Sequence, residues 1–180
     1  MTSAQHIAYE KALEYATDKH CGQIRKGGLP YITHPVAVAE IICEKGFGLD
    51  YQIAALFHDL LEDTDATEQE IEALSNREVL SAVKLLTKAP GYQMEEYVRN
   101  IRANAMAFAV KGADRLHNLR CAIHTDTDFK RKYILETVDW YLDFSAEIPL
   151  AVKELAQTLD QPIVELSFLY EPIETWKINQ

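Results

Sequence analysis

The sequence predicts an all-α fold, and three observations support that class. Apolar residues recur at spacings of three and four along most of the chain, which is the pattern of a helix with one buried face. Alternation of apolar and polar residues, which is typical of a half-buried strand, is almost absent. Capping residues, glycines and prolines divide the chain into segments of helical length. We therefore expect a helical bundle without a substantial sheet.

Length and composition predict one domain. The chain has 180 residues, of which 48% are apolar and 26% are charged, as in a globular protein. A chain of this size buries enough surface to fold without disulfides. Its three cysteines are far apart, which indicates reduced thiols. We expect a single domain over residues 1–180, with the motifs in about 9–142 and the helices of 143–180 packed on that part.

Caps and glycines define the elements expected in the first half of the chain. The expected helices cover 5–20, 35–44 and 51–61, followed by an acidic turn at 62–66 and two short helices. A glycine-rich stretch separates the first two helices, and Asp50 is a suitable N-cap for the third. The patterns Thr67-x-x-Glu70 and Ser75-x-x-Glu78 are capping boxes, and each predicts the start of a short helix.

Prolines define the elements expected in the second half. Pro90 and Gly91 break the chain, and helices are then expected at 93–104, 105–123 and 129–159, with a capping turn at 125–128. Pro149 lies inside the third of these helices and predicts a kink or a break there. Pro162 begins a last helix, which Pro172 ends or kinks.

The charge of the chain narrows the classes of partner. A net charge of −10 argues against nucleic acid, whose phosphate backbone requires a basic surface. Residues 77–132 nevertheless carry eleven Lys and Arg against six Asp and Glu, a local charge of +5 that could attract one small polyanion. The sequence has neither a long apolar run nor a signal-peptide pattern, so we expect a cytoplasmic protein without a membrane partner.

The first segment with residues suited to chemistry covers 25–35. It places Arg25 and Lys26 in a glycine-rich loop and His34 at the start of a helix. A plain helix connection with a capping histidine would have the same pattern, so the segment alone leaves both interpretations open.

The second segment, 57–64, follows a strongly apolar turn of helix. His58 and Glu62, like Asp59 and Asp63, are four residues apart and would share a helix face. An imidazole and three carboxylates at one end of a core helix favour a shared cation or proton transfer. The alternative is a frayed acidic helix end.

The third segment covers 110–120. Asp114 and Asn118 share a predicted helix face, and Cys121 lies almost one turn further along. A charged helix in which Asp114 pairs with a nearby arginine is the alternative. His117 is expected to be structural, and the other three histidines are expected to be surface or packing residues. An aromatic set of the C-terminal part is expected in the core: Tyr133, Trp140, Tyr141 and Phe144.

Taken together, the three segments supply a mixed nitrogen and oxygen donor set. Its members are His34, His58, Asp59 and Asp114. Such a set is typical of a site for a borderline or hard divalent ion such as Mn²⁺, and not of a zinc site with thiolate ligands. Four protein ligands would leave positions for water and for a substrate oxygen on a six-coordinate ion.

The ordered motifs R-K-x-G-x-P-Y-x-x-H-P, H-D-x-x-E-D-T and K-x-A-D-R-x-H-N-x-R resemble those of the HD-domain superfamily. More closely, the chain resembles the (p)ppGpp hydrolase domains of the RelA/SpoT-homologue type and, at this length, the small stand-alone alarmone hydrolases. The resemblance implies removal of the 3′-pyrophosphate of guanosine 3′,5′-bis(diphosphate) with the help of Mn²⁺. Because the chain ends at Gln180, we expect hydrolysis without synthesis.

The resemblance also implies a role for each matching residue. The implied metal ligands are His34, His58, Asp59 and Asp114, and the implied water-activating pair is Glu62 and Asp63. The implied nucleotide contacts are Arg25, Lys26 and Asn118, together with Cys121, which stands where the family often has threonine. Lys111 or Arg115 could add positive charge opposite the substrate.

Two other functions remain open at this point. Another metal-dependent nucleotide phosphohydrolase, such as an NADPH 2′-phosphatase or a nucleotidase, would release orthophosphate instead of pyrophosphate. A degenerate HD module would bind nucleotide without chemistry, although the intact acidic pair favours an enzyme. A homodimer is also compatible with the sequence.

Overall fold

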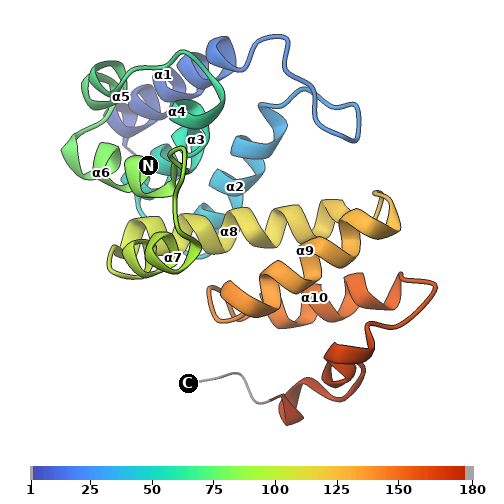
Figure 1. Cartoon of the computed structure of the whole chain (residues 1–180). Coiled ribbons are helices and arrows are strands. Elements are labelled where there is room, and N and C mark those ends of the chain that lie inside the picture. The colour runs from blue at the N-terminus through green and yellow to red at the C-terminus, as the bar shows by residue number, and fades with distance from the viewer. Residues whose placement is uncertain (1, 177–180) are drawn as a thin grey trace. The chain divides into compact units, whose positions relative to one another are not determined.

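The computed structural model describes residues 2–176, and the regular elements in that range are helices joined by turns and loops (Figure 1). Pairing of extended backbone within the described residues is confined to an isolated bridge between Ile24 and Pro30. The predicted all-α class is confirmed. No helix between residues 2 and 176 combines the length and the apolar character needed to cross a membrane.

The chain divides into two compact units, Met1–Asp114 and Arg115–Gln180, and helix α8 (Ala105–Ala122) contains the boundary between them. The expectation of one domain over residues 1–180 stays a prediction. The other helices of the first unit are α1 (Ser3–Lys19), α2 (Thr33–Glu44), α3 (Leu49–Phe57), α4 (Leu60–Asp63), α5 (Glu68–Leu74), α6 (Arg77–Leu86) and α7 (Met94–Arg102).

Helix α3 forms the centre of the first unit. All of its residues from 52 to 57 are buried, and it packs against α1, α2 and α6. Helix α5 contacts both α1 and α6, and α7 packs on α6. A short helix that is apolar on all sides needs such neighbours, because burial of its side chains supplies most of its stability.

Two predicted caps have different outcomes. Thr67 and Glu70 form the predicted capping box of α5, with the Thr67 side chain accepting from the Glu70 amide. The predicted box at Ser75 is wrong, because the Ser75 hydroxyl donates to the carbonyl of Ile71 at 2.6 Å and so closes the end of α5. Asn76 caps α6 in its place.

The predicted helix 51–61 is interrupted. Helix α3 starts at Leu49, with Gly48 and not Asp50 as its N-cap, and ends at Phe57, and α4 follows only at Leu60. The side chain of His58 gives a physical reason for the break, since its Nδ1 lies 2.7 Å from the carbonyl oxygen of Ala55 and satisfies one of the last carbonyls of α3.

The second unit contains α9 (Thr127–Trp140), α10 (Ile148–Gln157) and the 3₁₀ helices η1 (Val164–Tyr170) and η2 (Ile173–Thr175). Helix α10 packs against α9 and η1. The predicted helix over 129–159 is two helices, and Pro149 lies in the first turn of α10, where a missing N–H is tolerated. The last helix predicted after Pro162 is the 3₁₀ helix η1, which ends at Tyr170, two residues before Pro172.

Arg115 lies in the interior of the second unit, which corrects the expectation that it could face the substrate. Its guanidinium carbon is 4.2 Å from the ring centroids of both Tyr133 and Tyr141, and Nη2 lies 2.7 Å from Glu136 Oε1. Of the four aromatic residues predicted for the core, Tyr141 and Phe144 are buried, whereas Tyr133 and Trp140 are half-buried. Arg115 is therefore a structural residue whose charge is paired with that of Glu136.

Candidate functional site

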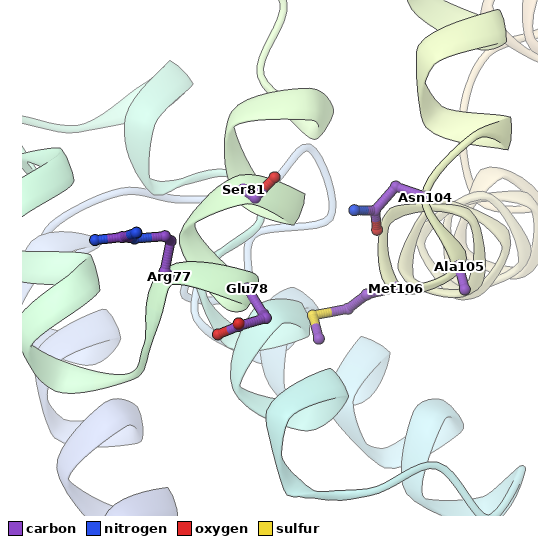
Figure 2. A pocket seen from close by; sticks show the side chains of 6 residues that line it. All are labelled: Arg77, Glu78, Ser81, Asn104, Ala105 and Met106. Carbon is purple, nitrogen blue, oxygen red and sulfur yellow. The ribbon is translucent and has the colours of Figure 1, made fainter.

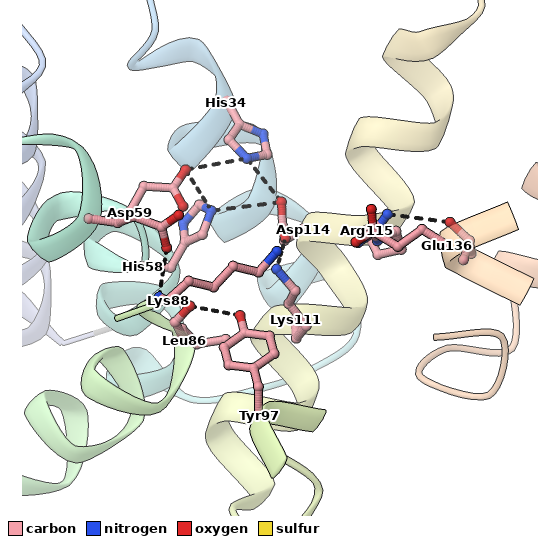
Figure 3. Close-up of polar contacts among 12 residues, drawn as sticks. His34, His58, Asp59, Leu86, Lys88, Tyr97, Lys111, Asp114, Arg115 and Glu136 are labelled. Atoms are coloured by element: carbon pink, nitrogen blue, oxygen red, sulfur yellow. Dashed lines mark hydrogen bonds and ion pairs between the residues drawn. The ribbon is translucent and has the colours of Figure 1, made fainter. Parts of the chain in front are cut away.

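Four donor atoms of the first unit lie close together (Figure 3). His34 Nε2 is 3.1 Å from Asp114 Oδ1 and 3.8 Å from Asp59 Oδ2. His58 Nε2 is 3.1 Å from Asp59 Oδ2 and 3.8 Å from Asp114 Oδ1. Ligand atoms at about 2.1 Å from one ion are about 3 to 4 Å from each other, so these separations fit donors that share a cation.

Two helices and the break between two others position these side chains. His34 lies in the first turn of α2, and Asp114 projects from α8. His58 and Asp59 occupy the two residues between α3 and α4. Within one helix, adjacent residues point about 100° apart. His58 and Asp59 lie in the break between α3 and α4, and there His58 Nε2 comes close to Asp59 Oδ2 although the two residues are adjacent in sequence.

The tautomer of His58 fits a metal ligand. A carbonyl oxygen can only accept, so the 2.7 Å contact with Ala55 places a hydrogen on Nδ1. The other nitrogen, Nε2, is buried and makes no hydrogen bond, although it lies 3.1 Å from a carboxylate oxygen. A metal-binding histidine commonly donates its second N–H to a backbone carbonyl in this way. The donor set and this orphaned nitrogen therefore fit a bound cation.

The electrostatics of the group point in the same direction. Burial lowers the pKa of His34, and Asp114 offsets only part of that effect. Burial also acts to lower the pKa of His58, but the carboxylates of Asp59 and Asp114 outweigh it and raise this pKa to about 9. Burial opposes ionisation of both aspartates, yet the neighbouring positive charges hold their pKa values below the usual range. Ionised carboxylates in a buried place require a cation beside them.

Lys111 supplies part of that positive charge. Its Nζ lies 2.9 Å from Asp114 Oδ2, so the other oxygen, Oδ1, faces the two histidines. Lys111 was expected near the substrate, and the structure pairs it with a candidate metal ligand. The spacing of three residues between them is that of a helical ion pair, which is a signal that the sequence contained.

The predicted acidic pair separates into two environments. Glu62 Oε2 accepts a hydrogen bond of 2.9 Å from the backbone N–H of Lys88, in the connection between α6 and α7. Asp63 Oδ2 lies 3.1 Å from the hydroxyl of Tyr31, and the same hydroxyl lies 2.7 Å from Asp59 Oδ2. Asp63 is thus linked to the candidate metal group, whereas Glu62 holds a loop.

Sequence reasoning gave Tyr31 no role. It belongs to the first motif, three residues before His34, but a tyrosine in a loop has the appearance of an ordinary packing residue. Burial and the two neighbouring carboxylates raise its pKa, so its hydroxyl keeps its proton. Only the folded chain reveals that this proton lies between two acidic site residues.

The predicted nucleotide-binding residues lie in separate parts of the chain. Arg25 and Lys26 begin a tight turn, in which the amide of Gly28 donates to the Arg25 carbonyl at 2.8 Å. Gly28 has a φ of +83°, a conformation that favours glycine. Asn118 and Cys121 belong to the second unit, where Cys121 Sγ lies 3.6 Å from His117 Nε2. Contact of these residues with a substrate stays a prediction.

A hollow of about 430 Å³ lies elsewhere in the first unit (Figure 2). Its lining consists of Arg77, Glu78, Ser81, Asn104, Ala105 and Met106. The hollow contains no histidine and none of the predicted site residues. We place the chemistry at the histidine and aspartate group, because that group has the perturbed pKa values and the convergent donors.

The family model described as "HD domain" matches residues 12–147. The chain belongs to the HD-domain family. This HD domain is also similar to longer curated proteins. It is 37% identical to a "Probable guanosine-3′,5′-bis(diphosphate) 3′-pyrophosphohydrolase" of Synechocystis sp., over 99% of this chain and 24% of that protein. It is 38% identical to the "Bifunctional (p)ppGpp synthase/hydrolase SpoT" of Escherichia coli, over 70% of this chain and 20% of that protein.

The HD domain therefore spans about a quarter or less of these relatives. A solved structure described as "A metazoan ortholog of SpoT hydrolyzes ppGpp and plays a role in starvation responses" matches it with a TM-score of 0.67 and 27% identity. That match covers 87% of this chain and 96% of the other. The resemblance to SpoT-type hydrolases is confirmed, and an HD domain implies dependence on a divalent metal ion.

Proposed function

We propose that this HD domain is a metal-dependent hydrolase that removes the 3′-pyrophosphate of guanosine 3′,5′-bis(diphosphate) or its pentaphosphate analogue. The observation that carries the proposal is the convergence of two imidazole nitrogens and two carboxylate oxygens, with nitrogen–oxygen distances of 3.1 to 3.8 Å. The names of two relatives and the description of the similar structure, all of which refer to ppGpp, support this substrate.

We propose Mn²⁺ as the ion, with His34, His58, Asp59 and Asp114 as its ligands. A mixed imidazole and carboxylate set suits a borderline or hard divalent ion, and the described residues place no cysteine in the group. When bound, the ion polarises a phosphoryl oxygen and acidifies the attacking water. Elemental analysis of the purified protein, followed by chelation and reloading with Mn²⁺, Mg²⁺ or Zn²⁺, tests this assignment.

Asp63 is the residue that we assign to the water proton. Its carboxylate is exposed, so it can reach a water, and the Tyr31 hydroxyl links it to the candidate ligand Asp59. A carboxylate in this position can orient the water and accept its proton as the water attacks the phosphorus that bears the 3′ oxygen. The bond between that phosphorus and the 3′ oxygen breaks, the 3′ oxygen takes up a proton from solvent water, and pyrophosphate is released.

Glu62 has a different assignment. One of its oxygens already accepts the Lys88 amide, so we propose that Glu62 mainly holds the connection between α6 and α7 beside the site. The motif implies that Glu62 and Asp63 activate the water together, whereas the proposal gives the two residues different roles. Exchanging Glu62 for glutamine keeps an acceptor for that amide, whereas alanine removes it.

The positive charge that faces the substrate is proposed to come from Arg25 and Lys26. Both belong to the first motif, three residues or fewer before the turn glycine Gly28. Lys111 pairs with Asp114, and Arg115 is buried against Glu136. Asn118 and Cys121 are proposed to contact the nucleoside. We also propose that the chain forms a single hydrolase domain with a cytoplasmic location. Its proposed partner is a small molecule, without nucleic acid or membrane, and a homodimer is compatible with this function.

Product analysis tests the function directly. Metal-loaded protein is incubated separately with ppGpp, pppGpp, NADPH and simple nucleotides, and pyrophosphate and orthophosphate are measured. We expect pyrophosphate and GDP from ppGpp. Orthophosphate from NADPH without turnover of ppGpp would establish the alternative phosphatase, and nucleotide binding without any turnover would establish a non-catalytic module.

Two histidine variants provide the matched comparison for this experiment. His58→Ala should lose both Mn²⁺ binding and turnover, because it removes a proposed ligand. His6→Ala removes an exposed imidazole of α1, whose Nε2 lies 4.0 Å from Glu10 Oε1. It should behave like the wild type in both measurements. Full turnover by His58→Ala would contradict the proposed site.

A further inference from the structure

The hydroxyl of Tyr31 lies between two carboxylates. Its oxygen is 2.7 Å from Asp59 Oδ2 and 3.1 Å from Asp63 Oδ2. A phenol carries one hydrogen, so the two carboxylates share a single donor. The shorter contact is to Asp59, at the same oxygen that lies 3.1 Å from His58 Nε2. One hydroxyl therefore connects the proposed metal ligand with the proposed acceptor of the water proton.

The ring of Tyr31 is held by two histidines. Its centroid lies 4.7 Å from that of His20, with an angle of 31° between the planes, and 6.1 Å from that of His34 in an edge-on arrangement. His20 is buried although the proposed reaction gives it no task. A ring packed in this way has little freedom to rotate, so the position of its hydroxyl is defined before any substrate binds.

A second connection joins the same loop to Asp63. The Nδ1 atom of His20 lies 2.8 Å from Gln23 Oε1, and since that oxygen can only accept, Nδ1 carries the hydrogen. The side-chain nitrogen Nε2 of Gln23 in turn donates to the backbone carbonyl of Asp63 at 2.8 Å. The loop therefore holds Asp63 at its main chain through Gln23 and at its carboxylate through Tyr31.

We propose that Tyr31 is a positioning residue, which holds the carboxylates of Asp59 and Asp63 at the separation that the hydrolytic step requires. This inference rests on the proposed function and adds to it a residue outside the predicted ligand and acid set. Hydrogen-bond partners of metal ligands orient those ligands, and their loss typically costs about 10 to 100-fold in metal affinity or activity.

The test is the substitution Tyr31→Phe, which keeps the ring and removes the shared donor. The measurements are the affinity of the chelated protein for Mn²⁺ by calorimetry, and kcat and KM with ppGpp. We expect a loss of about 10 to 100-fold in kcat with a weaker Mn²⁺ affinity, and little change in KM, because Tyr31 contacts carboxylates and not the nucleotide. Circular dichroism checks that the variant retains its helical content.

Tyr15→Phe is the matched control. The Tyr15 hydroxyl also donates to a carboxylate, Glu70 Oε2 at 3.0 Å, but this pair joins α1 to α5 away from the proposed ligands. It should leave kcat and Mn²⁺ affinity unchanged. If Tyr31→Phe matches Tyr15→Phe in both quantities and differs only in melting temperature, Tyr31 is merely structural and the inference is wrong.

The two proposals can fail separately. If the wild-type protein does not hydrolyse ppGpp, the proposed substrate is wrong, and the Mn²⁺ titration still decides whether Tyr31 supports the metal ligands. If the wild type hydrolyses ppGpp and Tyr31→Phe has the same kcat and Mn²⁺ affinity as the wild type, the proposed function is supported and the positioning role of Tyr31 is wrong.

Discussion

Lys111 Nζ lies 2.9 Å from Asp114 Oδ2, and this contact determines which oxygen of Asp114 faces the histidines. The other oxygen, Oδ1, is 3.1 Å from His34 Nε2. The Lys111 and Asp114 side chains are only 12% and 8% exposed, so neither charge is well hydrated. Burial costs such a pair much of its hydration, and each member depends on the other.

Replacing Lys111 with methionine should therefore destabilise the metal-free protein by about 3 kcal/mol, because Asp114 would keep a buried charge without its ammonium partner. Added Mn²⁺ would supply the missing positive charge, so it should raise the melting temperature of Lys111→Met more than that of the wild type. Urea denaturation and thermal melting with and without Mn²⁺ measure both effects. An equal shift in the two proteins would contradict a cation site at Asp114.

An exposed pair provides the control for that variant. Lys84 Nζ lies 2.8 Å from Glu68 Oε2, but both side chains are about half exposed. Exposed ion pairs contribute roughly 0 to 1 kcal/mol. Lys84→Met should change stability within that range and should leave the response to Mn²⁺ unaltered.

Substitutions at Glu62 and Asp63 should separate their roles. Asp63→Asn should keep Mn²⁺ bound while turnover falls by about 10² to 10⁴-fold, because an amide cannot accept the water proton. Glu62→Gln should retain most of its turnover, since its amide oxygen can still accept the Lys88 N–H, and Glu62→Ala should lose more. Steady-state kinetics with parallel metal analysis decides the question. If Glu62→Gln lost as much turnover as Asp63→Asn, Glu62 would share or hold the role of accepting the water proton, and the assignment to Asp63 alone would be wrong.

Arg115 should prove essential for stability and not for substrate binding. Arg115→Met leaves Glu136 without its guanidinium partner and should cost about 3 to 5 kcal/mol of unfolding free energy. Arg115→Lys should not restore it, because an ammonium cannot stack as a plane between Tyr133 and Tyr141. Urea denaturation measures the loss. Arg99→Met, at an exposed contact of 3.7 Å with Glu96, should stay near the wild type.

Glu70 should make the stability depend on pH at acidic values. Hydrogen bonds from Thr67 and Tyr15 lower the pKa of Glu70 from 4.5 to about 2. A carboxyl with a lowered pKa stabilises the fold above the pKa that it has in the unfolded chain, and the contribution is lost as the pH falls from about 4.5 to about 2. Glu70→Gln should melt below the wild type at pH 6, and the difference should shrink through that window. A constant difference in melting temperature would contradict the assignment.

The helical class, most helix positions and the set of candidate donors could be predicted from the sequence alone. These features depend on spacing along the chain, because residues three or four apart share a helix face wherever the helix later packs. The break between α3 and α4 was missed, since it depends on the contact of the His58 side chain with the Ala55 carbonyl. Helical periodicity contains no sign of that hydrogen bond.

The pairing of the charged residues, in contrast, depends on how the helices pack. Lys111 and Arg115 stand four residues apart in one motif, yet one binds a candidate metal ligand and the other is buried between two tyrosine rings. Tyr31 likewise gained a role only when the loop before α2 came to lie against Asp59 and Asp63. The physical reason is that a hydrogen bond or ion pair requires atoms within about 3 to 4 Å of each other. Between segments far apart in sequence, that distance is set by how the helices pack.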